Sequence, residues 1–125
     1  MEASKAFYIV RYFGHFMTVD EHAAHKHLIA TAKSMHGRTD LAAQTELRNS
    51  PRANVLRTLL SNKPEVLRLT QEGLSEFVLR TARRILDEHP DKIRFNYCSR
   101  CGTLARTPKA RQCRSCGLDW HNVKF

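Results

Sequence analysis

Four cysteines in the last third of the chain have the spacing of metal ligands. Cys98 and Cys101 form one Cys-x-x-Cys pair, and Cys113 and Cys116 form a second pair after eleven intervening residues. Two residues between the members of a pair let both sulfurs turn toward one point, and two such pairs complete a tetrahedron of soft ligands suited to Zn²⁺. The sequence therefore predicts one zinc ion held by all four thiolates.

A glycine follows the second cysteine of each pair and strengthens this prediction. Gly102 and Gly117 can adopt a positive φ, which lets backbone N–H groups approach thiolates that need donors. With the four cysteines and these two glycines, the segment resembles the zinc-ribbon superfamily, in which two such knuckles face each other across a short β-hairpin. The resemblance covers about 30 of the 125 residues. It implies a fold and a metal but no single function, because ribbons of this kind occur in nucleic-acid-binding proteins, enzyme appendages and adaptors alike.

A zinc ion with four protein ligands has no open position for water or substrate, so we expect a structural site. A segment of about 30 residues buries too little apolar surface to fold alone, and the ion would supply the missing stability. Two other uses of the cysteines stay open, a rubredoxin-like iron site and a redox-active dithiol pair. His121 could also replace one cysteine as a ligand.

The positive charge of the chain is concentrated around these cysteines. The formal net charge is +9, and residues 92–125 hold eight Lys or Arg against the single acid Asp119, a difference of +7. Four thiolates with one divalent ion add about −2, which leaves roughly +5. A basic segment of this kind is either a solvated face or a surface that contacts nucleic-acid phosphates. The candidate contacts are Arg100, Arg106, Lys109, Arg111 and Arg114.

Two apolar side chains accompany the cysteine pairs. Leu104 precedes an expected turn at residues 107–109, and Trp120 follows the second pair. We expect both to pack beside the metal site, because so small a unit needs its only tryptophan in its core. Trp120 could instead stack on a nucleic-acid base.

The region 18–90 has the apolar periodicity of three or four helices. Residues 18–21 (Thr-Val-Asp-Glu) predict a capping box for a helix over about 19–36. Asp40 is a candidate cap for a short second helix that ends before Asn49.

Two more helices are expected before residue 90. Ser50 and Pro51 are typical of the N-cap and first position of a third helix, and the longest periodic stretch runs from about residue 64 to 89. Gly73 is the weak point of that stretch, so two helices that meet there are an alternative. Charge pairs four residues apart are expected on its exposed face, Glu76 with Arg80 and Arg84 with Glu88.

The ends of the helical region are less regular. After Pro90, the alternation of Ile93, Phe95 and Tyr97 with polar residues predicts a half-buried strand that leads into the first cysteine pair. The aromatic-rich leader 1–17 fits either a strand or helical turn over the core, or a docking segment. Met17 is also an alternative natural start, because the capping box follows it directly.

Five histidines lie in the N-terminal part of the chain: His15, His22, His25, His27 and His36. We expect surface histidines, with a second metal site as the alternative. His22 and His25 share a helix face, but the residues between them are alanines and supply no catalytic glutamate. Phosphate-binding glycine loops, nucleophile elbows and dinucleotide fingerprints are also missing from the sequence.

Together these patterns predict a mainly α protein, with a helical region at 18–90 and a four-cysteine zinc ribbon with a small β-hairpin at 91–125. We expect a soluble, cytoplasmic protein, because no signal peptide or membrane span is evident and paired cysteines suit a reducing compartment. We expect it to be non-enzymatic, because the metal site has no open position and no catalytic motif is found. The leading hypothesis is a nucleic-acid-associated or regulatory protein that contacts DNA or RNA through the basic ribbon. The alternative is an adaptor, or a homodimer, in which the helices bind another polypeptide and the ribbon is purely structural.

Overall fold

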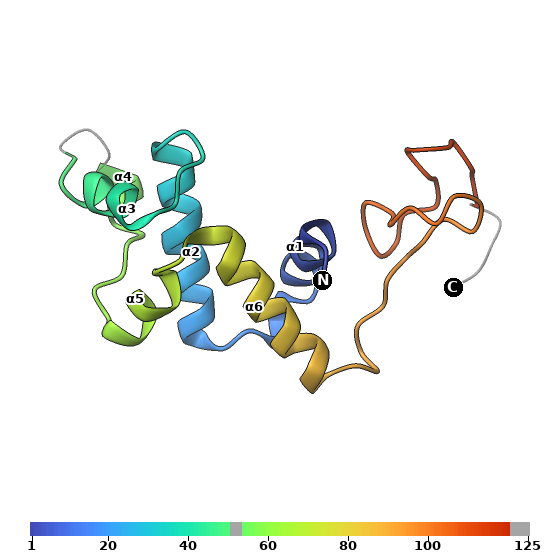
Figure 1. The fold of residues 1–125 in the computed structure, drawn as a ribbon, viewed down its shortest axis with the longest axis horizontal. Coiled ribbons are helices and arrows are strands. Elements are labelled where there is room, and N and C mark those ends of the chain that lie inside the picture. The colour runs from blue at the N-terminus through green and yellow to red at the C-terminus, as the bar shows by residue number, and fades with distance from the viewer. Residues whose placement is uncertain (51–53, 121–125) are drawn as a thin grey trace.

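The computed structural model describes residues 1–50 and 54–120, and it is mainly helical in this part of the chain (Figure 1). The helices precede a C-terminal segment that carries the cysteines and contains isolated β-bridges but no continuous strand within residues 92–120. The helical elements are α1 (Ala3–Tyr12), the 3-10 turn η1 (Gly14–Phe16), α2 (Val19–Ser34), α3 (Leu41–Arg48), α4 (Asn54–Arg57), α5 (Pro64–Thr70) and α6 (Gly73–Glu88).

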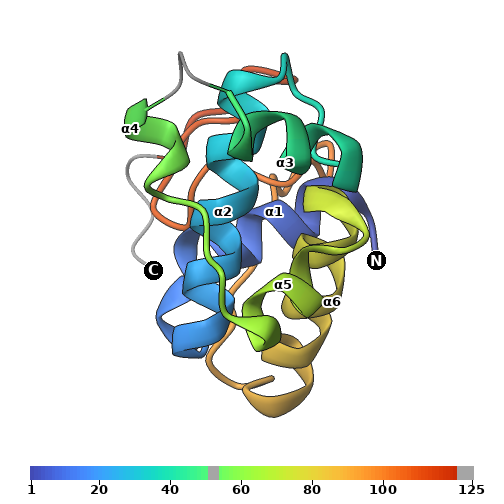
Figure 2. The ribbon, with the colours of Figure 1, turned by 90° about the vertical axis from the view of Figure 1, so that its left-hand side faces the viewer.

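The starts of α2 and α3 are confirmed as the sequence predicts. The Thr18 hydroxyl accepts the Glu21 backbone N–H at 3.1 Å, and the Glu21 carboxylate accepts the Thr18 N–H at 2.8 Å, which completes a capping box. Asp40 accepts the Ala43 N–H at 3.0 Å and caps α3, which ends before Asn49. Figure 2 shows α2 running through the helical region with α3 and α4 at one end.

The prediction of three or four helices between residues 18 and 90 is too low, because the described residues there form five. The longest periodic stretch divides at Gly73, where φ is +87°, so the two-helix alternative holds. The short α4 begins at Asn54, and the predicted start at Pro51 lies outside the described residues.

The aromatic leader forms α1 and η1 and contributes to the hydrophobic core. Ala6, Ile9 and Val10 of α1 are buried in one cluster with α2, α5 and α6 residues, which include Leu28, Val66 and Ile85. Helix α1 packs mainly against α6, and α2 packs against α5 and α6. The leader therefore covers the core, as the first of its two interpretations predicts.

A largely buried ion pair joins α6 to the start of α2. The Arg84 guanidinium contacts both Glu21 carboxylate oxygens, with Nε 3.0 Å from Oε2, and also donates to the Phe16 carbonyl at 3.2 Å. The predicted pair of Arg84 with Glu88 is present at 2.6 Å. The prediction for Arg80 is wrong, because Arg80 pairs at 2.5 Å with Glu72, in the turn before α6, and not with Glu76.

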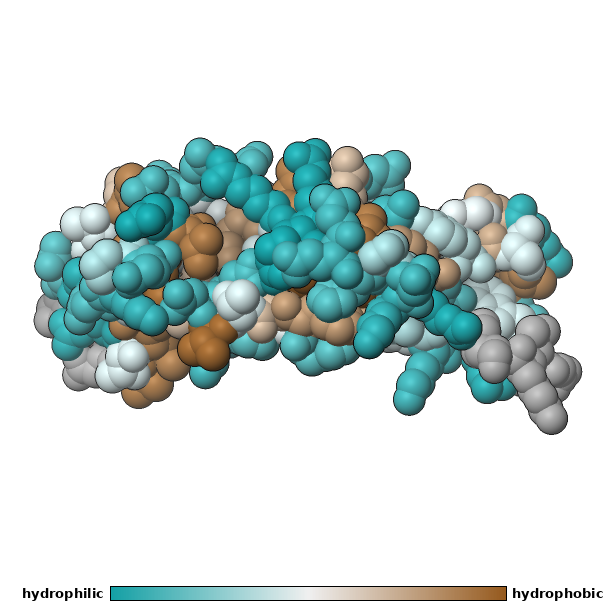
Figure 3. Space-filling view, turned by 90° about the horizontal axis from the view of Figure 1, so that it is seen from below, coloured by the Kyte–Doolittle hydropathy of each residue, from teal (hydrophilic) through white to brown (hydrophobic). Residues whose placement is uncertain are grey.

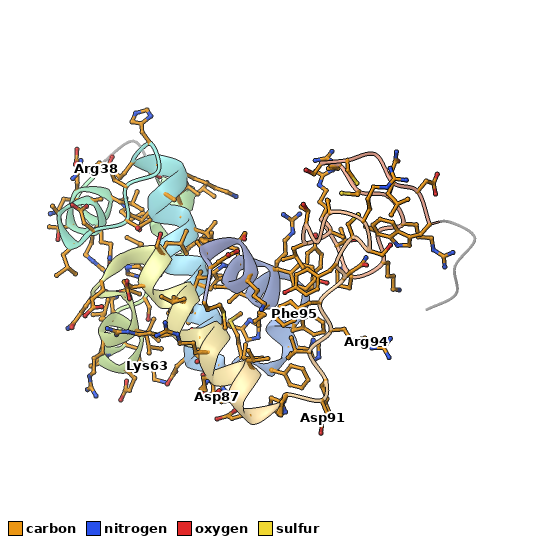
Figure 4. All side chains as sticks on the ribbon, turned by 45° about the vertical axis from the view of Figure 1, so that its right-hand side comes forward. Arg38, Lys63, Asp87, Asp91, Arg94 and Phe95 are labelled. Atoms are coloured by element: carbon orange, nitrogen blue, oxygen red, sulfur yellow. The ribbon has the colours of Figure 1, made fainter. Side chains whose placement is uncertain are left out.

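The predicted strand at 93–97 is also wrong. Ile93 is buried in the helical core and Phe95 stacks on Tyr8 of α1 at a centroid distance of 5.8 Å. Figure 4 shows Phe95 turned toward α1 and Arg94 turned away from it. Side-chain contacts with the helical core therefore hold residues 93–95 in place. Within residues 93–97, only Tyr97 forms a β-bridge, an isolated one to Leu104. None of the described helices combines the length and the apolar character needed to cross a membrane.

The histidines are not all on the surface, which corrects that expectation. His27 has no exposed surface, its Nδ1 accepts the Ser61 N–H at 3.1 Å, and its Nε2 lies 2.8 Å from the Gln44 amide oxygen. The Gln44 amide in turn donates to the carbonyls of Thr39 and Thr70, each at 3.0 Å. These bonds require an uncharged His27 with its proton on Nε2, and burial accordingly lowers its pKa.

Candidate metal centre

The four predicted cysteines lie together. Their sulfur atoms are all within 4.8 Å of one another, and no other group of three or more His, Cys, Asp or Glu side chains in the described residues is placed to hold a metal ion. Sγ of Cys98 is 3.5 Å from Sγ of Cys116, and Sγ of Cys101 is 3.5 Å from Sγ of Cys113. These distances exceed a disulfide bond of about 2.05 Å, and all four thiols are free.

Each close sulfur contact joins one pair to the other, so the two Cys-x-x-Cys turns face each other. Cys98 and Cys113 are buried, whereas Cys101 is exposed and Cys116 is half-buried. The arrangement can hold one metal ion with ligands from both halves of the segment. It would join the two Cys-x-x-Cys turns to each other.

The backbone around the two pairs repeats the same hydrogen bonds fifteen positions apart. The Cys98 N–H donates to Thr103 O at 2.9 Å, and the Cys113 N–H donates to Leu118 O at 2.7 Å. Gly102 N–H to Cys98 O and Gly117 N–H to Cys113 O are both 2.9 Å. The isolated antiparallel bridges match as well, Tyr97 with Leu104 and Gln112 with Asp119. Two equivalent knuckles, residues 96–105 and 111–120, therefore present the four sulfurs.

The glycines behave as their position predicts. Gly102 and Gly117 have φ values of +74° and +80°, a conformation that other residues rarely adopt. The tight turn brings the Cys116 N–H to 3.5 Å from Sγ of Cys113. Backbone donors near sulfur favour the thiolate form.

The electrostatics of the cluster favour a bound cation. Thr103, through its hydroxyl 3.1 Å from the sulfur and its backbone, lowers the pKa of Cys101 to about 6. The Leu118 backbone N–H acts to lower the pKa of Cys116, but burial and the neighbouring thiols outweigh it and raise that pKa to about 11. Four thiolates cannot share so small a volume without a compensating charge, which a divalent ion supplies.

Asn96 fixes the link between the knuckles, a role that the sequence pattern did not reveal. Its side-chain amide donates to Thr107 O at 3.1 Å, at the start of the predicted turn at 107–109, and to Ala110 O at 2.8 Å, just after that turn. The Ala110 N–H closes that turn onto Thr107 O at 3.2 Å. No β-hairpin joins the knuckles within the described residues, because the two bridges are isolated.

The basic residues predicted to contact phosphates lie in the two knuckles and in the link between them. Arg100, Arg106, Lys109 and Arg114 are all exposed, and none of the four forms an ion pair with an acid in the described part of the chain. Arg111 differs, because it is half-buried and its carbonyl accepts the backbone N–H of Trp120 at 2.7 Å.

The two apolar neighbours are both half-buried. Leu104 lies in the first knuckle, where it forms the bridge to Tyr97. Trp120 has a buried indole N–H without a hydrogen-bond partner among the described residues. Its burial agrees with the packing interpretation better than with a ring held open for a base. His121 lies outside the described residues.

Comparison with protein-family models, curated proteins and solved structures gave no match. The resemblance to zinc ribbons rests on the four cysteines, the two glycines and the paired knuckles.

Proposed function

We propose that this chain is a non-enzymatic zinc protein whose four-cysteine centre is structural and whose basic knuckle surface binds nucleic acid. The metal part rests on the sulfur geometry. A tetrahedral zinc with Zn–S bonds of about 2.3 Å requires sulfurs about 3.8 Å apart, close to the 3.5 Å separations of the facing cysteines. All four ligand positions would be filled by protein, which leaves no position for a substrate. Free thiols in such a site suit a reducing, cytoplasmic environment.

The observation that carries the nucleic-acid proposal is the set of four cations without acidic partners among the described residues, at positions 100, 106, 109 and 114. Cations already paired with carboxylates have little left to gain from phosphates, whereas these four remain available. The zinc ion fixes their relative positions by joining the two knuckles. A recognition helix is missing from the described part of this segment, so binding should depend on phosphate charge more than on base sequence.

Fluorescence anisotropy with labelled DNA and RNA at several salt concentrations tests this proposal. We expect binding at about 50 mM salt whose affinity falls steeply as salt increases, with a shallower dependence in Arg100→Ala and Arg114→Ala. Arg83→Ala, an exposed arginine on α6, is the matched control and should change the salt dependence little. Absence of binding at low salt, or affinity that salt does not change, would contradict the proposal.

An adaptor is the second candidate, and exposed apolar side chains favour it. Leu41, Val55, Leu59 and Leu69 have exposed fractions of 55%, 79%, 44% and 37%. Figure 3 shows hydrophobic side chains among hydrophilic ones at the end formed by α3, α4 and α5. Pull-down after nuclease treatment separates the candidates, because an adaptor keeps its partner without nucleic acid. Loss of that partner in Leu41→Ser would place the contact on α3.

A further inference from the structure

A groove of about 1710 Å³ lies between helix α1, the start of α2 and the first knuckle. Its walls come from segments far apart in the sequence, α1 and residues 102–106, and Tyr97 also lines it. Sites for small ligands usually enclose about 300–1,000 Å³. A groove of this size suits a segment of a polymer better than one small molecule.

The groove is lined by exposed aromatic rings. Phe7 and Tyr97 are 40% and 46% exposed, the most exposed phenyl and phenol rings in the described part of the chain, and both line the groove. Tyr12, which is half-buried, lines it too. Exposed rings on the walls of one groove are unfavourable in water, and they offer flat surfaces on which unpaired bases can stack.

The groove also carries an excess of positive charge. Lys5, Arg11 and Arg106 line it against the single acid Glu2, a difference of +2. None of the three cations forms an ion pair with a described acid. Lys5 and Arg11 lie against rings instead. Lys5 Nζ is 4.5 Å from the Phe95 centroid, and the Arg11 guanidinium is 5.6 Å from the Tyr12 centroid.

From these contacts we infer that the groove binds a single strand of nucleic acid, with bases stacked on Phe7 and Tyr97 and phosphates beside Lys5, Arg11 and Arg106. This inference rests on the proposed function and specifies its ligand. A duplex keeps its bases stacked inside and cannot use the rings, and an acidic peptide would use the cations alone. Because Arg106 belongs both to the groove and to the knuckle surface, the strand would pass from one to the other.

The test uses the full zinc-loaded chain and a fluorescein-labelled oligothymidine of about 15 nucleotides, with a DNA duplex of equal length as comparison. We expect the single strand to bind about tenfold or more tightly than the duplex. Phe7→Leu keeps an apolar side chain but removes the ring, and it should weaken single-strand binding by about tenfold. Arg11→Ala should weaken it and reduce the salt slope by about one, whereas Arg68→Ala on α5, equal in charge change, should have little effect.

The results distinguish failure of the inference from failure of the proposed function. The duplex and the single strand could bind with equal affinity, and Phe7→Leu with native helix content could leave both affinities unchanged. That result would refute single-strand binding in the groove and would leave the proposed phosphate binding in place. Absence of binding to either probe would overturn both. If polyglutamate displaced oligothymidine equally well per charge and Phe7→Leu had no effect on either, the occupant would be an acidic polypeptide and the inference would be wrong.

Discussion

Replacing Gly73 with alanine is expected to destabilise the helical region far more than the same change at Gly37. The two glycines have nearly identical φ values, +87° and +88°, so an added Cβ meets the same backbone strain at each. The surroundings differ. A Cβ on Gly73 would lie 3.0 Å from the Thr39 hydroxyl and 3.4 Å from the Thr39 carbonyl oxygen, whereas one on Gly37 would have no neighbour within 4 Å.

The expected difference follows from these contacts. A left-handed alanine costs about 1–2 kcal/mol, partly offset by about 0.4–1 kcal/mol of unfolded-state entropy, so Gly37→Ala should cost about 1 kcal/mol. At Gly73 the displaced Thr39 hydroxyl also accepts the Leu74 N–H at 2.9 Å. Losing that bond and moving the side chain add about 1–2 kcal/mol. The Thr39 carbonyl also binds Gln44, so the disturbance would extend toward His27.

Urea unfolding followed by far-ultraviolet circular dichroism measures this difference. With a slope of about 2 kcal/mol per molar, the midpoint of Gly73→Ala should lie about 0.5–1 M below that of Gly37→Ala. Both variants should keep the native helix content before unfolding. Equal midpoints would show that the close approach of Thr39 to the α5–α6 junction is wrong.

Three further outcomes are expected. Burial, aided by the charge of Arg48, keeps the pKa of His27 below its ordinary value, so the unfolded chain takes up the proton first and stability should fall as pH drops below about 6.5. Urea midpoints at several pH values measure this fall, and an equally steep fall in His27→Leu would exclude His27 as its source. Arg84→Ala should lower the free energy of unfolding by about 1–3 kcal/mol, because it leaves the largely buried Glu21 carboxylate without its ion-pair partner. Arg80→Ala removes an exposed ion pair and should cost under about 1 kcal/mol. Equal losses of stability in denaturant unfolding would refute this ranking. Chelation of the metal should leave the helical circular dichroism nearly unchanged, since the described helices end at Glu88, and should speed tryptic cleavage after Arg100. Loss of most of the helical signal would instead show that the helices need the bound metal to stay folded.

The clustering of the four cysteines and the starts of α2 and α3 could be predicted because their signals are local. The positions of Cys98, Cys101, Cys113 and Cys116 follow from a short-range repeat, and the capping box at the start of α2 involves residues three apart. Such patterns depend on backbone geometry within one turn and need no knowledge of the rest of the fold.

The remaining features depend on contacts between distant residues. Ile93 and Phe95 alternate as in a strand, yet their partners are the helical core and Tyr8, so tertiary packing overrides the pattern. The sequence around His27 predicts a surface histidine, because its hydrogen-bond partners Gln44 and Ser61 belong to other segments of the chain. Asn96 likewise has no local signal, because both of its acceptors lie more than ten positions away.

The most direct test of the metal centre is the metal content of the purified chain, measured by inductively coupled plasma mass spectrometry. The facing knuckles predict one zinc ion per chain, lost when Cys113 is replaced by serine. Protein that is folded and reduced but contains no stoichiometric metal, or that contains iron in place of zinc, would contradict the account.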